Sequence, residues 1–141
     1  METNIAKAET DIDASKDKVW DALVNADTIK KYMFGTTVTT DWKPGSKITW
    51  SGEWEGKPYE DKGEILSINE GKTLQYSHYS PLSKEDDKPE NYHTVTIHLS
   101  ENGAQTHVVL TQDGNKTAEA KAHSEKNWKM MLESMKKLLE G

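Results

Sequence analysis

The sequence predicts an α+β fold in which a curved antiparallel sheet of about seven strands wraps around a long C-terminal helix. Two observations support this prediction. Between residues 117 and 139, apolar side chains recur at steps of three and four, which is the period of one helix face. Most upstream segments alternate apolar and polar residues, as strands with one buried face do. A one-sided helix is marginal alone in water, so we expect the sheet to cover it.

The chain opens with one strand and two short helices. The segment 5–12 alternates, and its apolar face carries Ala6, Ala8, Thr10 and Ile12. Ser15 is expected to cap a helix over 16–25, and Asp27 a second helix that ends near 34–35. The first strand must pair with a late strand, because otherwise its edge stays open.

Strands and short turns follow. Six segments are predicted as strands: 36–41, 46–55, 59–69, 73–80, 92–99 and 105–112. Ile65 and Ile68 cannot share a face by strict alternation, so a β-bulge is expected near Leu66 and Ser67. The charged stretch 84–90 is either a lid or a solvated connector, and the connector is the simpler interpretation.

The C-terminal helix has one apolar stripe and one charged side. The stripe consists of Trp128, Met131, Leu132, Met135, Leu138 and Leu139. The opposite side carries Lys126, Lys129, Glu133, Lys136 and Lys137. Gly141 follows the last periodic residue, and lysines in the final turns suit the helix dipole.

Length and composition exclude several classes of protein. A chain of 141 residues predicts a single domain over residues 1–141. A net charge of −6 argues against a nucleic-acid partner. The sequence has no apolar run long enough for a membrane span, no secretory pattern at its start and no cysteine. We therefore expect a cytoplasmic protein, and a monomer because no free apolar face demands a partner.

Five stretches of this sequence carry a resemblance to a known superfamily. They are ASKDKVWDALVNADTIKKYMFG, DWKPGSKITW, GEILSINEGKTLQYS, TVTIHLSENGAQTHVVLTQDGN and NWKMMLESMKKLLE. In order and spacing they resemble the START-like (SRPBCC) superfamily, whose fold is called helix-grip, and most of all its branch homologous to the activator of the Hsp90 ATPase. Ser46 and Asn127 replace glycines of the family pattern. Tyr32 and Met33 stand where the family commonly has tryptophans, and with Trp128 they lie where the resemblance implies a pocket.

The resemblance implies a ligand cavity between sheet and helix, since helix-grip proteins usually enclose one. An ordinary filled core is the equally weighted alternative, because aliphatic residues are scarce. The expected ligand-binding residues face inward: Ile48, Trp50, Trp54, Tyr76, His78, Val95, Ile97, Leu110, Trp128, Met131 and Met135. Aromatic walls would bury the ligand, and Tyr76 and His78 would orient its polar end.

Three functions follow from these observations. The leading hypothesis is a protein that binds an apolar or aromatic small molecule, such as a lipid, a polyketide or a flavonoid-like compound. The second is a co-chaperone-like domain acting on the Hsp90 ATPase, as the resemblance implies. The third is a cyclase or dehydratase that uses the same cavity, although a role without catalysis is favoured.

No catalytic, metal or cofactor motif stands out. His78 and His93 share inward faces and could act as general bases, but a histidine satisfied by a backbone group is the simpler interpretation. His98 and His107 are expected on the other face. Glu53, Glu60 and Glu64 could supply an acid or base only if one turned inward. Because neither metal spacing nor a phosphate or dinucleotide loop is present, no metal and no cofactor is expected.

Overall fold

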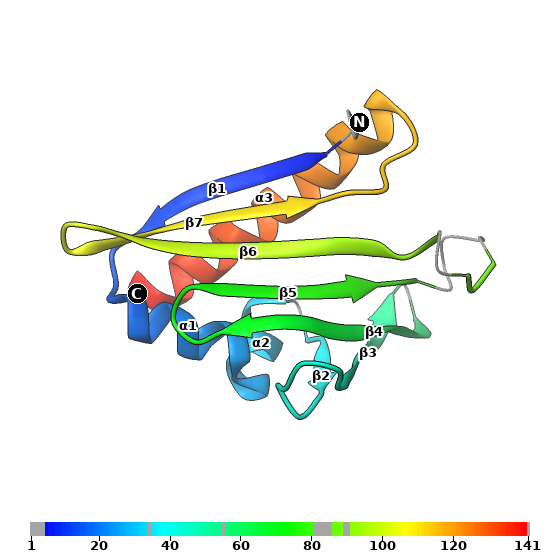
Figure 1. The fold of residues 1–141 in the computed structure, drawn as a ribbon, viewed down its shortest axis with the longest axis horizontal. Helices are drawn as coiled ribbons and strands as arrows, with labels where there is room; N and C mark the ends of the chain where they lie inside the picture. The colour runs from blue at the N-terminus through cyan, green and yellow to red at the C-terminus, as the bar shows by residue number, and fades with distance from the viewer. Residues whose placement is uncertain (1–4, 34, 55, 81–85, 89–90, 141) are drawn as a thin grey trace.

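The computed structural model describes residues 5–33, 35–54, 56–80, 86–88 and 91–140, and it confirms the predicted α+β fold (Figure 1). The elements in chain order are β1 (Ala6–Ile12), α1 (Lys16–Val24), α2 (Ala26–Tyr32), β2 (Thr37–Thr39), β3 (Lys47–Trp54), β4 (Lys57–Asn69), β5 (Thr73–His78), β6 (His93–Asn102), β7 (Gln105–Gln112) and α3 (Ala118–Glu140). Of the charged stretch 84–90, only residues 86–88 are described. In the described part of the chain, no helix is both long and apolar enough to span a membrane.

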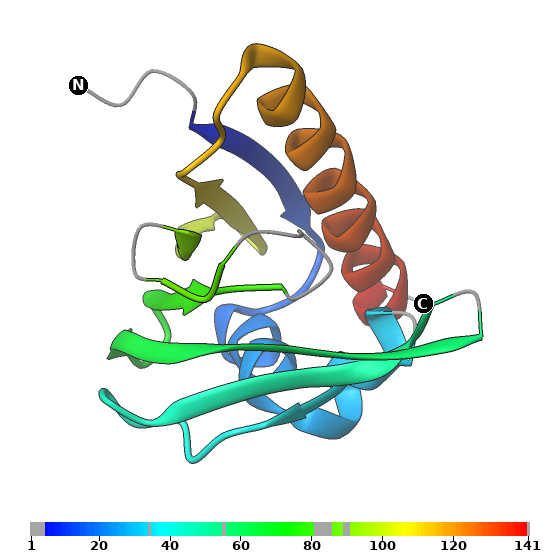
Figure 2. The same cartoon turned by 90° about the vertical axis from the view of Figure 1, so that its right-hand side faces the viewer.

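Within the described residues, seven strands form one antiparallel sheet in the order β1-β7-β6-β5-β4-β3-β2. The expectation that the first strand pairs late is confirmed, because β1 lies beside β7 with Ala8 opposite Leu110. The helices cover one face of this sheet. Figure 1 shows α3 passing behind β7 and β6, and Figure 2 shows the helices on one side with β1 along α3.

Local capping places the two short helices. The Ser15 hydroxyl accepts a hydrogen bond from the Lys18 N–H at 3.2 Å, as expected for a helix N-cap. The prediction that Asp27 caps the second helix is wrong. Asn25 caps it, because its Oδ1 accepts from the N–H groups of Asp27 and Thr28 at 3.0 and 3.2 Å. Helix α1 ends at Val24, so the single residue Asn25 closes one helix and begins the next.

The core lies between the inner face of the sheet and the second half of α3. Four α3 side chains are buried: Met131, Leu132, Met135 and Leu139. Leu138, assigned to the same stripe, is 38% exposed. The first half of α3 has no fully buried residue and reaches past the core toward the end of β7.

Charged side chains of α3 seal the free edge of β1. The Lys7 N–H donates to Glu125 Oε2 at 3.0 Å, and the Asp13 N–H donates to Glu140 Oε2 at 2.7 Å. Two of the lysines between these glutamates donate to carbonyl groups of the same strand. Lys129 Nζ donates to the Glu9 carbonyl at 2.7 Å and Lys136 Nζ to the Asp11 carbonyl at 2.6 Å. Backbone groups that would otherwise pair with another strand are therefore occupied.

Strand β4 contains the predicted bulge, between Ile65 and Ser67. The bulge lets both Ile65 and Ile68 pack on the core. Before it, β4 approaches β5 closely at Gly63. A Cβ on Gly63 would stand 1.8 Å from the Ser77 carbonyl oxygen, so only glycine fits there.

Candidate functional site

Three neighbouring hollows lie between the inner face of the sheet and helices α2 and α3, among the described residues. Their volumes are about 270, 80 and 30 Å³. Met33, at the end of α2, borders all three, and Trp128 borders the two larger ones. Trp50 and Tyr76 border the two smaller ones. The hollows therefore follow one another along a single path from the first half of α3 into the core.

Aromatic rings form the walls of the inner part of this path. The Trp50 ring lies 5.1 Å from the Tyr76 ring, tilted by 48°. It lies 5.0 Å from the His78 ring, which meets it edge-on at 63°. Such tilted contacts are favourable for aromatic pairs and hold three rings from strands β3 and β5 in fixed positions across the intervening β4.

The outer end of the path is closed by contacts between α3 and the end of β7. The Trp128 indole N–H donates to Gln112 Oε1. Ser124 Oγ donates to Asn115 Oδ1 at 2.8 Å, and Asn115 Nδ2 donates to the Gln112 carbonyl at 3.1 Å. These bonds tie the first half of α3 to the sheet at the widest hollow.

An Asp–His pair supplies the polar end of the path. Asp61 on β4 and His78 on β5 both border the 80 Å³ hollow, and Asp61 Oδ2 lies 2.9 Å from His78 Nε2. An ionised carboxylate can only accept, so Nε2–H is the donor. The other oxygen, Asp61 Oδ1, is buried and has no hydrogen-bond partner among the described residues. A buried polar atom without a partner is rare, so Asp61 Oδ1 needs a donor from a water molecule or a ligand.

Hydroxyl groups of two further residues lie at the same hollow. Thr36 Oγ1 donates to the Met33 carbonyl at 2.7 Å and lies 2.8 Å from the Tyr59 hydroxyl. Because Thr36 has only one proton, Tyr59 is the donor in that pair. Gly52 stands opposite Tyr59 and leaves room for its ring, since a Cβ there would lie 2.9 Å from the Tyr59 hydroxyl.

Two buried tyrosines differ in how their hydroxyl groups are satisfied. Burial raises the pKa of Tyr32 and of Tyr76 far above the ordinary value of 10.0, so both hydroxyls are protonated. The Tyr32 hydroxyl donates to the Ala22 carbonyl at 2.9 Å. For the Tyr76 hydroxyl, the described residues provide no hydrogen-bond partner.

The sequence-predicted site residues fall into three groups. Seven border the hollows: Ile48, Trp50, Tyr76, His78, Ile97, Trp128 and Met131. Val95, Leu110 and Met135 are fully buried in the core and do not border the described hollows. Trp54 belongs to β3, and its side chain lies outside the described part of the structure. The ligand-binding role of all these residues stays a prediction.

The carboxylate that faces the hollows is not one of those considered from the sequence. Glu53, Glu60 and Glu64 are all exposed, so none of them turns inward. Asp61 does, because β4 alternates strictly backward from buried Ile65 before its bulge. Counting back from Ile65 in steps of two could have identified Asp61 as inward-facing. The irregular pattern after the bulge made it unclear which residues of the whole strand face inward.

His93 and His107 have local partners. His93 Nδ1 donates to the Asp113 carbonyl at 2.9 Å, as expected for a histidine satisfied by backbone. On the outer face, His107 lies 2.8 Å from Asp11 Oδ1 and 3.2 Å from Glu9 Oε2, one through each ring nitrogen. The Asp11 carboxylate raises the pKa of His107 above its ordinary 6.5. Among the described residues, no group of three or more His, Asp or Glu side chains could hold a metal ion.

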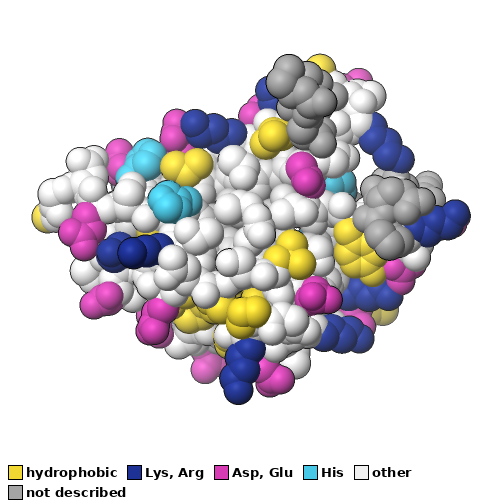
Figure 3. Space-filling view, in the orientation of Figure 1, with side chains coloured by type: hydrophobic (Ala, Val, Ile, Leu, Met, Phe, Trp, Pro, Cys, Tyr) yellow, Lys and Arg dark blue, Asp and Glu magenta, His cyan; other side chains and the backbone are white. Residues whose placement is uncertain are grey.

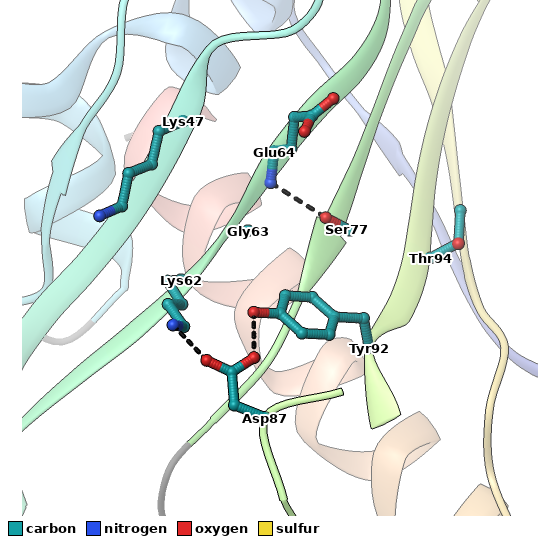
Figure 4. A pocket seen from close by; sticks show the side chains of 8 residues that line it. All are labelled: Lys47, Lys62, Gly63, Glu64, Ser77, Asp87, Tyr92 and Thr94. Carbon is teal, nitrogen blue, oxygen red and sulfur yellow. Dashed lines mark hydrogen bonds and ion pairs between the residues drawn. The ribbon is translucent and has the colours of Figure 1, made fainter. Parts of the chain in front are cut away.

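A larger hollow of about 620 Å³ lies on the outer face of the sheet, bordered by Lys47, Lys62, Gly63, Glu64, Ser77, Asp87, Tyr92 and Thr94 (Figure 4). Three of its polar side chains already bind one another. Asp87 pairs with Lys62 and accepts from the Tyr92 hydroxyl at 2.6 Å, and the Lys62 ammonium lowers the pKa of Asp87. Figure 3 shows this face, where hydrophobic side chains are scattered in small groups. It is less suited to an apolar ligand than the inner path.

Comparisons with known proteins agree with this architecture. The model of the family described as "Activator of Hsp90 ATPase homolog 1-like protein" matches residues 13–140. No curated protein matches the chain. A solved structure from Cytophaga hutchinsonii is 56% identical with a TM-score of 0.87, and the match covers 99% of this chain and 96% of that chain.

Two more distant structures share the fold. The Aha1 dimer from Colwellia psychrerythraea is 23% identical with a TM-score of 0.75, over 96% of this chain and 96% of that chain. CalU16 from Micromonospora echinospora is 21% identical with a TM-score of 0.73, over 93% of this chain and 73% of that chain.

Proposed function

Because this chain belongs to the family of Activator of Hsp90 ATPase homolog 1-like proteins, a branch of the START-like superfamily, we propose that it binds an aromatic small molecule between its sheet and α3. The observation that carries the proposal is the path of three hollows that all border Met33, with Trp128 shared by the two larger ones and Trp50 and Tyr76 by the two smaller ones. Small-molecule sites usually occupy roughly 300–1,000 Å³, and the volumes of the three hollows together reach the lower end of that range.

The chemistry of the walls supports this function. Most lining groups are aromatic rings, aliphatic side chains or methionines, which bury an apolar guest and adapt to its shape. A few polar groups stand at one place, around Asp61 and His78. This combination of apolar walls and convergent polar atoms is typical of sites that both bury and orient a ligand.

Backbone strain at the path is a further supporting observation. Trp42 borders the smallest hollow and has a φ of 58°, in the left-handed region that bulky residues avoid. Such strain costs about 1–3 kcal/mol and persists only where the surrounding structure holds the backbone in place, which is common at binding sites.

Blocking the wide hollow tests the proposal. Asn127 borders it from an exposed position on α3, so Asn127→Trp should fill the space without disturbing the core. We expect the variant to weaken binding of 2-naphthol, used as a two-ring probe, at least tenfold by NMR titration. Lys126→Trp is the matched control, because Lys126 is exposed on the same helix and does not border the hollow.

Stability offers an independent readout. A ligand at 100 times its dissociation constant raises the free energy of unfolding by about 2.7 kcal/mol. A broad screen of aromatic compounds by thermal unfolding should therefore yield clear shifts. Equal affinity of the two tryptophan variants, or a screen without a shift, would contradict a site in this cavity.

A co-chaperone-like function is the second candidate, and the family membership favours it. The chain would then act on the Hsp90 ATPase through its surface rather than through its cavity. A pull-down with Hsp90, together with the chaperone's ATPase rate in the presence of this protein, separates the two functions. No enrichment and no change of rate would end the co-chaperone hypothesis and leave ligand binding unaffected.

A further inference from the structure

Two unpartnered polar groups at the inner hollow define what a ligand must offer. Asp61 Oδ1 is a buried acceptor, and no described residue donates to it. Tyr76 borders the same 80 Å³ hollow, and its protonated hydroxyl has no described acceptor. A ligand that satisfies both groups must donate one hydrogen bond and accept another within this hollow.

Several other polar groups around this hollow are already engaged. The Tyr59 proton goes to Thr36, and the Thr36 proton goes to the Met33 carbonyl. His78 Nε2 is bound to Asp61 Oδ2, and at the outer end the Trp128 indole N–H is bound to Gln112. Asp61 Oδ1 still needs a donor, and the Tyr76 hydroxyl still needs an acceptor.

The charge of the path opposes an anionic ligand. None of the described residues that border the three hollows is a lysine, and the chain contains no arginine, the side chain best suited to hold a carboxylate. The Asp61–His78 pair carries a charge of −1 when His78 is neutral and of zero when it is protonated. A carboxylate brought to Asp61 would therefore meet a like charge or no net charge in a desolvated place, which is unfavourable.

A single hydroxyl group fits these demands best. Its proton can bind Asp61 Oδ1 while its oxygen accepts from the Tyr76 hydroxyl. An ammonium group has donors but no acceptor, so it would leave Tyr76 unsatisfied. A wholly apolar guest would leave both atoms unpaired, which costs affinity.

We propose that this cavity selects neutral aromatic compounds bearing a hydroxyl, that it rejects carboxylates, and that Asp61 is the residue that sets this selectivity. The inference rests on the proposed function, since it assigns a ligand class to the same cavity. It excludes fatty acids and other anionic lipids from the candidate ligands.

Four probes with one ring system test the selectivity: 2-naphthol, 2-naphthoate, 2-naphthylmethylammonium and naphthalene, each titrated by NMR at neutral pH. For the unmodified protein we expect 2-naphthol to bind at least tenfold more tightly than each of the others. In Asp61→Asn, the preference for 2-naphthol over 2-naphthoate should fall to about threefold or less, because the repulsive charge is gone.

Asp11→Asn is the matched control, since it makes the same change in an Asp–His pair on the outer face. It should keep the preference of the unmodified protein. Tyr76→Phe provides a second variant if Asp61→Asn does not fold, and it should bind 2-naphthol more weakly while its affinity for naphthalene is unchanged.

The outcomes separate the two levels of the proposal. The inference is wrong if naphthalene binds and 2-naphthol binds no more tightly than naphthalene. It is also wrong if 2-naphthoate or the ammonium compound binds as tightly as 2-naphthol. In both cases the cavity remains a binding site. If Asp61→Asn folds and keeps the full preference, Asp61 does not set the selectivity. If none of the four probes binds, the proposed function fails and the inference fails with it.

Discussion

At the scale of single residues, two buried tyrosines provide a paired test of the cavity. Removing the Tyr32 hydroxyl leaves the buried Ala22 carbonyl without its donor, so Tyr32→Phe should lower the free energy of unfolding by about 1–3 kcal/mol. Tyr76→Phe removes a hydroxyl that has no described partner, so it should change stability by less than about 1 kcal/mol, in either direction. Urea unfolding of both variants without ligand measures the difference. Equal losses would show that the Tyr76 hydroxyl is satisfied within the protein.

His107 gives stability a dependence on pH. Its pKa is raised first by the hydrogen bond to Asp11 and then by Glu9, so the folded state binds the proton more tightly than the unfolded state. The resulting stabilisation is fully present below the ordinary pKa of 6.5 and is lost as pH rises through the higher folded value. The variant His107→Gln should show a shallower loss of stability above pH 6.5. Parallel curves for the two proteins would contradict this assignment.

Asp61 shows why single residues of the site were only partly predictable. The inward positions of Trp50, Tyr76 and His78 followed from simple alternation of their strands, and the structure brings these three rings together. Asp61 was overlooked because β4 changes register at its bulge. Alternation shows which face of the sheet a residue lies on only up to such an irregularity. One extra residue moves every later side chain to the opposite face.

At the scale of elements, the contact between α3 and β1 holds the helix to the sheet and also covers the free edge of β1. Glu125 and Lys129 hold the first half of α3 to backbone groups of the edge strand, next to the hollow that Asn127 borders. We propose that this seal keeps the protein monomeric, although a relative of this fold is a dimer. The short strand β2 forms the opposite edge of the sheet and offers few groups for pairing.

Lys129→Met tests the seal, since the substitution keeps the apolar stem and removes the donor to the Glu9 carbonyl. We expect a loss of about 0.5–1 kcal/mol in the free energy of unfolding, small because the bond is exposed. Size-exclusion chromatography should show more dimer or higher assembly than for the unmodified protein. Lys126→Met, at an exposed position of the same helix, is the control and should change neither quantity. Equal behaviour of the two variants would argue against the seal.

The elements themselves were largely predictable, and their ends were not. The strong periodicity of α3 and the alternation of β1, β6 and β7 determined those elements within a few residues. The cap of α2 was misplaced because Asn25 and Asp27 are both good capping residues, and only the backbone shows which side chain reaches the free N–H groups. Leu138 was assigned to the buried stripe because periodicity gives the direction of a side chain but not the extent of the sheet above it.

At the scale of the whole molecule, the question is whether sheet and helix enclose usable space. The sequence predicted that they face each other, which the structure confirms. It did not predict the space, because cavity volume depends on sheet curvature and on the reach of α3. The close approach of β4 to β5 at Gly63 and the hydrogen bond from Trp128 to Gln112 are two such features, and neither follows from a pattern of apolar residues.

The measurement that tests the cavity most directly uses the methionines as probes. With 13C-methyl-labelled methionine and bound 2-naphthol, intermolecular NOEs report which methyl groups lie near the ligand. Met33 and Met131 border the path, whereas Met130, its neighbour on α3, is 53% exposed and does not. We predict NOEs from the ligand to Met33 and Met131 and none to Met130. NOEs to Met130 alone, or to Tyr92 on the outer face instead of to Met33 and Met131, would contradict a ligand held between sheet and helix.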